Sequence, residues 1–103
     1  MKIEFIKSPS SGALAILARR STTDSAPGQA GAVGLVQGAL AEMIAAADIA
    51  EKAASVWVEE IRGVCPQHVT LIAIYGDIAA VEHALRSIEE RFKGVPSGPD
   101  GAV

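Results

Sequence analysis

The sequence predicts an α+β fold, in which two main helices cover a four-stranded antiparallel sheet in a ferredoxin-like sandwich. Four short runs of apolar residues have the length and pattern of strands, and two longer stretches repeat apolar residues every three or four positions, as helices do. Their order along the chain is strand, strand, helix, strand, strand, helix. Only a short turn separates the last two strands, which is typical of an antiparallel hairpin.

The first two strands are expected near the start of the chain. Residues 2–7 alternate polar and apolar side chains up to Pro9, which predicts a strand with one face in solvent. Residues 13–18 are continuously apolar and are followed by Arg19 and Arg20. This run predicts a second strand that is buried on both faces in the centre of the sheet.

A loop and the first helix are expected next. Residues 21–31 contain Ser, Thr, Asp, Pro and Gly without apolar periodicity, which predicts a flexible loop longer than the ~4 to 6 residues usual for such connections. From residue 34 to residue 54 the apolar residues follow the pattern of an amphipathic helix of about twenty residues. Its face of small residues can lie flat on a sheet.

The hairpin and the second helix have the clearest patterns. Residues 56–62 and 68–75 both predict strands. Asp77 is expected to cap a helix whose apolar positions are spaced alternately three and four residues apart, at Ile78, Val81, Leu85, Ile88 and Phe92. The helical residues expected to pack against the sheet are Leu40, Met43, Val81 and Leu85.

Length and composition limit what the chain can be. With 103 residues there is room for one core, so residues 1–93 are expected to form a single domain and residues 94–103 a flexible tail. The net charge is −3 and the basic residues form no stripe, which argues against a nucleic acid partner. The sequence shows neither a signal peptide nor the ~20 apolar residues of a membrane span. Together with one unpaired cysteine, this predicts a cytoplasmic protein with no membrane partner.

The cysteine lies between the two hairpin strands, in a segment called the cysteine turn below: Gly63-Val64-Cys65-Pro66-Gln67-His68. A hairpin tip often meets a partner, a ligand or a symmetry axis, because its backbone is exposed while the strands hold it in place. One thiolate cannot hold a metal cluster, so other copies of the chain would have to supply further ligands. A buried thiol that acts as a small apolar side chain remains the alternative.

The remaining chemistry-bearing residues do not form a catalytic set. His68 stands three residues after Cys65, so both a secondary metal ligand and an ordinary strand residue remain open. His83 is expected on the solvated side of the second helix. The sequence contains no Ser–His–Asp pattern, paired carboxylates or phosphate-binding loop, so we expect no enzymatic activity. A thiol enzyme that uses Cys65 would have only His68 as its general base.

The chain from about residue 13 to residue 93, apart from the loop 21–31, resembles the bacterial microcompartment shell domain, or BMC domain. The motifs Ala-Ala-Asp-x-x-x-Lys-Ala-Ala at 46–54 and Gly-Asp-Ile-Ala-Ala-Val at 76–81 carry the resemblance most clearly. Ordinary members have a last strand after the second helix, whereas here an additional strand, residues 2–7, lies at the front. This order resembles the circularly permuted shell proteins, although the chain begins too late for the N-terminal β-barrel that some of them place over the pore.

The cysteine turn resembles the pore loop of the permuted shell protein of glycyl-radical-type propanediol microcompartments, whose pore cysteine is associated with an iron–sulfur cluster. The resemblance implies a homohexamer with this turn at the six-fold axis, where six copies of Cys65 converge. It also implies an iron–sulfur cluster of the 4Fe-4S type as cofactor, shared between chains and used for electron transfer or redox sensing. Four thiolates usually hold such a cluster, so a bound cluster would either use only some of the six cysteines or distort the ring.

The resemblance further implies a structural protein whose partners are other shell proteins and whose location is the microcompartment shell in the cytoplasm. Lys52 occupies the position at which such proteins place an edge lysine against its symmetry mate in the next hexamer, and Lys93 is expected to assist at the same edge. A solvated lysine at the end of a helix is the alternative for Lys52. A small oligomeric ferredoxin-like signalling module that binds an effector at residues 21–31 is the alternative function.

Overall fold

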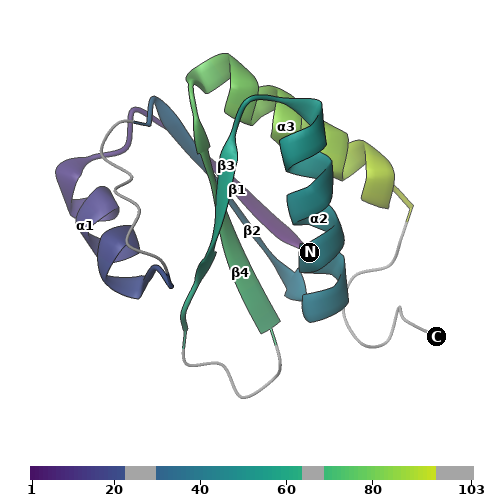
Figure 1. Cartoon of the computed structure of the whole chain (residues 1–103), viewed down its shortest axis with the longest axis horizontal. Helices are drawn as coiled ribbons and strands as arrows, with labels where there is room; N and C mark the ends of the chain where they lie inside the picture. The colour runs from purple at the N-terminus through teal and green to yellow at the C-terminus, as the bar shows by residue number, and fades with distance from the viewer. Residues whose placement is uncertain (23–29, 64–68, 95–103) are drawn as a thin grey trace.

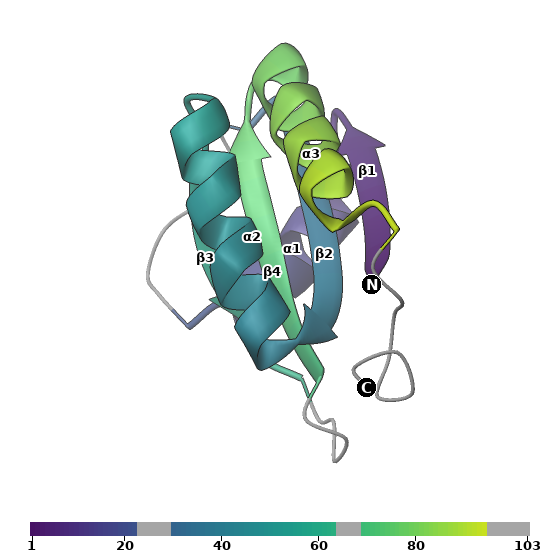
Figure 2. The same cartoon turned by 90° about the vertical axis from the view of Figure 1, so that its right-hand side faces the viewer.

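The structure, a computed structural model, describes residues 1–22, 30–63 and 69–94. It contains one sheet with two helices on one face and a third helix on the other (Figures 1 and 2). The elements in chain order are β1 (Lys2–Lys7), α1 (Ser11–Arg20), β2 (Ala32–Ala39), α2 (Leu40–Ala53), β3 (Trp57–Ile61), β4 (Val69–Gly76) and α3 (Ile78–Phe92).

The sheet has four strands in the order β1-β2-β4-β3, and all neighbours are antiparallel. The four-stranded antiparallel sheet and the α+β class are therefore confirmed. Val33 pairs with Tyr75 across the two central strands, and Trp57 pairs with Tyr75 on the other side of β4. Strands β1 and β3 are the two edges of the sheet.

The strand predicted at residues 13–18 is wrong, because these residues belong to α1. Ser10 caps this helix, and its hydroxyl oxygen accepts a hydrogen bond of 3.1 Å from the Ala13 backbone N–H. Ala and Leu, which dominate the run, are strong helix formers, and a six-residue apolar run does not distinguish a strand from a helix. Of this segment only Leu17 is buried, while Ile16 is 50% exposed.

The helix predicted from residue 34 to residue 54 begins too early, because residues 32–39 form the central strand β2. This strand is apolar on both faces, so its residues imitate the start of a helical repeat. The helix α2 begins at Leu40, where the Ala39 backbone N–H donates a hydrogen bond of 3.3 Å to Glu42 Oε1. Leu40 itself is 55% exposed, which corrects the expectation that it packs against the sheet.

The hairpin and the last helix agree with the prediction. Strands β3 and β4 pair antiparallel within the two segments expected to form the hairpin. Asp77 is the N-cap of α3 and accepts a hydrogen bond of 2.8 Å from the Ala80 N–H. His83 is exposed, as expected.

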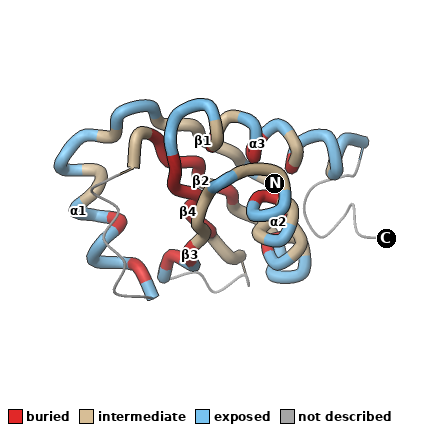
Figure 3. Tube along the Cα trace, turned by 45° about the horizontal axis from the view of Figure 1, so that its top comes forward, coloured by how far each residue is buried: buried red, intermediate tan, exposed pale blue. Residues whose placement is uncertain are grey.

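Two apolar cores lie on the two faces of the sheet, and Figure 3 shows that buried positions concentrate along β2 and β4. The larger core lies between the sheet and the helices α2 and α3, and its buried members include Val36, Met43, Ile74, Val81, Leu85 and Ile88. The smaller core lies under α1 and consists of Leu17, Val33, Ile61, Ala73 and Tyr75. None of the three described helices combines the length and the apolar character needed to cross a membrane.

Candidate functional site

The cysteine turn lies at the end of the sheet where β3 stops and β4 starts. Gly63 is exposed, and a Cβ atom built on it would meet no atom of the described residues within 4 Å, its chain neighbours aside. The rest of the turn lies outside the described residues: Val64, Cys65, Pro66, Gln67 and His68. The structure thus confirms the two strands that hold the turn, while the positions of the thiol and of the histidine remain predictions.

The chain that leaves α1 is attached to β3 at the base of this turn. The Arg62 N–H donates a hydrogen bond of 2.7 Å to the Arg20 carbonyl, and the Thr22 N–H donates one of 3.3 Å to the Glu60 carbonyl. A β-bridge joins Ser21 and Ile61. Because β3 pairs with β4 through its other edge, residues 20–22 cover part of the outer edge of the sheet next to the cysteine turn.

Beneath this junction lies a buried polar cluster of Ser21, Glu59 and Tyr75, which the sequence analysis missed. The Ser21 hydroxyl donates a hydrogen bond of 2.5 Å to Glu59 Oε1. Glu59 is buried, with only 4% of the residue exposed. Within the described part of the chain, neither Glu59 Oε2 nor the Tyr75 hydroxyl has a hydrogen-bond partner. The sequence does contain a signal for the burial of Glu59. Side chains alternate between the two faces of a strand, so Glu59 shares a face with the apolar residues Trp57 and Ile61.

The environment of Tyr75 favours its neutral form. Burial first, and the negative charge of Glu59 second, raise the pKa of the Tyr75 phenol to about 12. The ring is fully buried and stacks on Trp57, with the ring centroids 5.5 Å apart. Ionising this phenol inside the fold is therefore more costly than ionising it in the unfolded chain, where its pKa is about 10.

We expect the free energy of unfolding to fall as the pH rises from about 10 to about 12, by about 2 kcal/mol. The pKa of the Tyr75 phenol is higher in the folded protein than in the unfolded chain. Its contribution to stability is therefore complete below pH ~10 and is lost as the pH rises to the folded pKa of about 12, because the unfolded chain releases this proton first. Tyr75 is the only tyrosine of the chain, so ultraviolet absorption of the phenolate reports on it alone. Tyr75→Phe should remove this part of the pH dependence, and a native phenol that titrates near pH 10 would contradict the prediction.

The other predicted site residues lie on the helices. Lys52 is exposed on α2, where its Nζ lies 2.9 Å from Asp48 Oδ2 in an i,i+4 ion pair. Lys93 is the exposed C-cap residue of α3. The helix α2 begins at the end of the sheet next to the cysteine turn and α3 begins at the other end, so the two helices run in opposite directions (Figure 2).

The residues that the structure describes bring together no group of three or more His, Cys, Asp or Glu that could hold a metal ion. Cys65 and His68 lie outside these residues, so the proposed metal site is not tested by this observation. A site at the cysteine turn would in any case need thiolates from several copies.

Comparison with known proteins identifies the family. The model of the BMC domain matches residues 32–97. The GrpU microcompartment shell protein from Clostridiales bacterium 1_7_47FAA, in a ligand-free structure, is 41% identical over 88% of this chain and 94% of that chain, with a TM-score of 0.66. The chain belongs to the family of bacterial microcompartment shell proteins. The resemblance to the BMC domain seen in the sequence is therefore confirmed.

Two further structures extend the comparison. The ligand-free GrpU shell protein from Pectobacterium wasabiae is 39% identical over 85% of this chain and 99% of that chain, with a TM-score of 0.69. The fused permuted hexameric shell protein MSM0275 of the RMM microcompartment shares the fold, with a TM-score of 0.71 at 20% identity over 99% of this chain and 48% of that chain. No curated protein sequence matches the chain.

Family membership determines the broad function and the location. This BMC-domain protein is a building block of the microcompartment shell, a structure that forms in the cytoplasm. The predicted location is thereby confirmed, and the family match favours a shell protein over the alternative of a ferredoxin-like signalling module.

Proposed function

We propose that six copies of this shell protein form a ring with the cysteine turn at its axis, and that some of the six Cys65 thiolates together hold an iron–sulfur cluster of the 4Fe-4S type. The observation that carries the proposal is the placement of the chain's one cysteine in the short connection between the paired strands β3 and β4. The likeness to two GrpU shell proteins supports the role of the chain in a shell, and the cluster rests on the cysteine. The cluster would transfer electrons across the shell or sense redox conditions.

The exposed apolar residues support a ring-shaped assembly. Leu40 is 55% exposed and Ile44 is 63% exposed, both on the half of α2 that lies at the same end of the sheet as the cysteine turn. With Val58 and Ile72 they line an open groove beside the edge strand β3. Large apolar side chains grouped on one surface mark an interaction site more often than a free surface.

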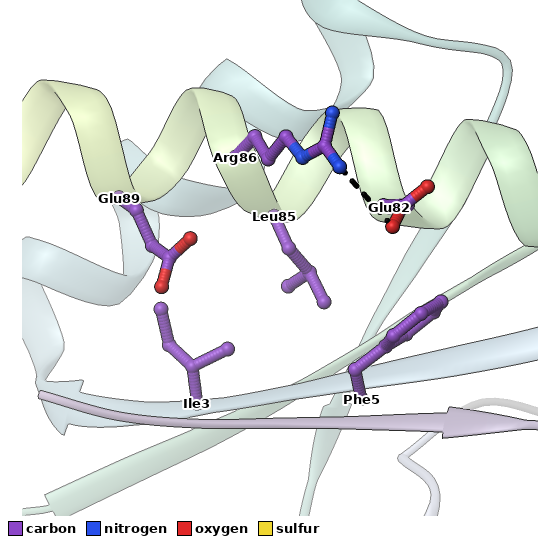
Figure 4. A pocket seen from close by; sticks show the side chains of 6 residues that line it. All are labelled: Ile3, Phe5, Glu82, Leu85, Arg86 and Glu89. Carbon is purple, nitrogen blue, oxygen red and sulfur yellow. Dashed lines mark ion pairs between the residues drawn. The ribbon is translucent and has the colours of Figure 1, made fainter.

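The opposite edge of the sheet offers a different surface. There, β1 and α3 form a second groove, in which Ile3, Phe5 and Leu85 lie below the ion pair of Glu82 and Arg86 (Figure 4). Two different surfaces at opposite edges suit a head-to-tail contact, in which one edge of a copy binds the other edge of its neighbour. Such contacts close into a ring when the rotation between neighbouring copies divides a full turn evenly. Among the structures similar to this chain, MSM0275 is described as hexameric and PduB as trimeric. Light scattering at micromolar concentration tests the ring, and a monomer would contradict it.

The residue types of the cysteine turn fit an iron–sulfur cluster. Thiolate is the usual ligand of such clusters, and several chains around one axis supply what a single chain lacks. Backbone N–H groups of Val64 and Gln67 would stabilise the negative charge of the cluster and its thiolates, whereas Pro66 donates none and restricts its own backbone. When bound, the cluster supplies one-electron redox chemistry.

The direct test is purification of the protein without oxygen, followed by an absorption spectrum and assays for iron and sulfide. We expect a brown protein that contains iron and sulfide in equal amounts and that bleaches in air, because a cluster at a pore faces solvent. Protein that binds no iron after anaerobic reconstitution would contradict the cluster and leave the shell function unchanged.

Lys52 is proposed to make the contact between neighbouring hexamers that builds flat sheets, with Lys93 assisting. Lys52→Ala should leave the hexamer intact and abolish the sheets seen in electron micrographs, because the lysine stem is exposed and available for a lateral contact. The ion pair with Asp48 is exposed on both sides and contributes about 0.5 kcal/mol or less. Asp48→Ala is the matched control, since it breaks the same ion pair and keeps the lysine; sheets that persist in Lys52→Ala would assign Lys52 to the solvated surface.

A further inference from the structure

Three arginines gather where α1 meets the end of β3. Arg19 and Arg20 form the last turn of α1, and Arg62 directly follows β3. Together with Ile16 they line one open pocket, called the arginine pocket below. Figure 1 shows the end of α1 beside the lower end of β3, where the chain enters the cysteine turn. All three arginines are exposed.

Backbone contacts hold the arginines in place. The Arg62 N–H donates to the Arg20 carbonyl at 2.7 Å, while Arg20 Nη1 donates to the Arg62 carbonyl and Arg62 Nη2 to the Arg19 carbonyl, both at 3.4 Å. A guanidinium group has five N–H donors. Arg20 and Arg62 therefore use one long hydrogen bond each to fix their direction and keep most of their donors available.

No carboxylate among the described residues forms an ion pair that would balance the positive charge of the pocket. Of the residues at 1–22, 30–63 and 69–94, no acidic side chain forms an ion pair with any of the three arginines; the two ion pairs seen there join other residues. The nearby Glu59 is buried and accepts a hydrogen bond from Ser21. Basic residues at a helix C-terminus interact favourably with the helix dipole, which accounts for the positions of Arg19 and Arg20. It does not account for a third arginine, Arg62, beside them after β3.

We propose that the arginine pocket binds a small oxyanion, through a phosphate or carboxylate group. The planar guanidinium matches both groups with paired, charge-assisted hydrogen bonds, and a bound anion relieves the repulsion among three like charges. Ile16, which is 50% exposed, provides an apolar wall for the remainder of the ligand. The pocket belongs to each protomer, and its binding does not depend on the iron–sulfur cluster.

The test uses the assembled wild-type protein at low salt, titrated by calorimetry with inorganic phosphate and separately with acetate. We expect saturable binding of at least one of the two, and the stronger one identifies the anionic group that the pocket prefers. Arg19→Gln/Arg62→Gln should weaken this binding by about tenfold or more, since hydrogen bonds between charged groups are lost. The control Lys7→Gln/Arg91→Gln removes the same two charges elsewhere and should change the affinity by less than about twofold.

A second measurement does not depend on any variant. In methyl NMR spectra of the wild type, the Ile16 signal should shift on titration, while that of Ile78, which is also exposed but lies at the start of α3, should not. The proposal is overturned if neither anion binds saturably, if Ile16 and Ile78 respond alike, or if the control variant loses as much affinity as the pocket variant. It is equally overturned if Arg19→Gln/Arg62→Gln dissociates the oligomer, because the arginines would then hold copies together.

Discussion

Cys65→Ser is expected to remove the brown chromophore of the anaerobically purified protein completely and to leave its oligomeric state unchanged. Serine has nearly the same shape as cysteine, but a hydroxyl oxygen is a poor ligand for iron in a cluster compared with a thiolate. The substitution acts on every copy at once, so no subset of thiolates remains. The oligomer should persist because the described residues of the helices and strands form the two apolar cores without Cys65, which belongs to the connection between β3 and β4.

Absorption, iron content and light scattering measured on the same samples separate the possible outcomes. His68→Ala is the comparison variant and should weaken the cluster only partly, as expected of a neighbour and not of a main ligand. A serine variant that keeps the spectrum of the wild type would refute the role of Cys65. A serine variant that dissociates would instead show that the cysteine turn contributes to assembly, contrary to the expectation.

The parts of the fold that were predicted correctly are those with an unambiguous period. In α3 the apolar spacing continues over four turns and Asp77 marks its start, so neither its type nor its position was open to confusion. The β3–β4 hairpin was recognisable because two strand patterns flank a turn too short for any other connection.

Short apolar segments were misassigned for a physical reason. The run 13–18 and the segment 32–39 are both apolar and short, so periodicity alone cannot tell a strand from a helix. The first was predicted as a strand and is part of a helix. The second was predicted as a helix from residue 34 on and is a strand, so the two errors left the number of strands correct. The capping hydroxyl of Ser10 was the local signal for α1, but it was interpreted as a break.

The site was predictable only where it is contiguous in sequence. The cysteine turn could be singled out because its residues follow one another. The arginine pocket could not, because Arg20 and Arg62 are 42 positions apart and meet only when α1 is attached to β3. The same holds for Ser21 and Glu59, which are 38 positions apart.

Gly34→Val is expected to lower the free energy of unfolding by about 2 kcal/mol. Gly34 lies on the face of β2 that α3 covers, and a Cβ atom there would stand 2.8 Å from Leu85 Cδ2 and 3.0 Å from Leu85 Cδ1. Leu85 is itself only 5% exposed and is packed in the larger core, so its side chain has little room to move away from the new methyl groups. Valine adds two methyl groups beyond the Cβ, which increases the overlap.

The clash between a side chain at position 34 and Leu85 can be tested by substituting Leu85 as well. Leu85→Ala alone should cost about 2 to 5 kcal/mol, because it leaves a cavity in the core. In the double variant the valine fills part of that cavity, so the two costs should sum to more than the measured loss by about 1 kcal/mol or more. Gly12→Val is the matched control, since the nearest atom to a Cβ at this exposed position is Ser10 Oγ at 4.0 Å, and it should change stability by no more than about 0.5 kcal/mol. Urea unfolding of the four variants and the wild type is measured at one fixed protomer concentration, because the stability of an oligomer depends on concentration. Strictly additive losses would show that Gly34 and Leu85 do not share the space that the structure gives them.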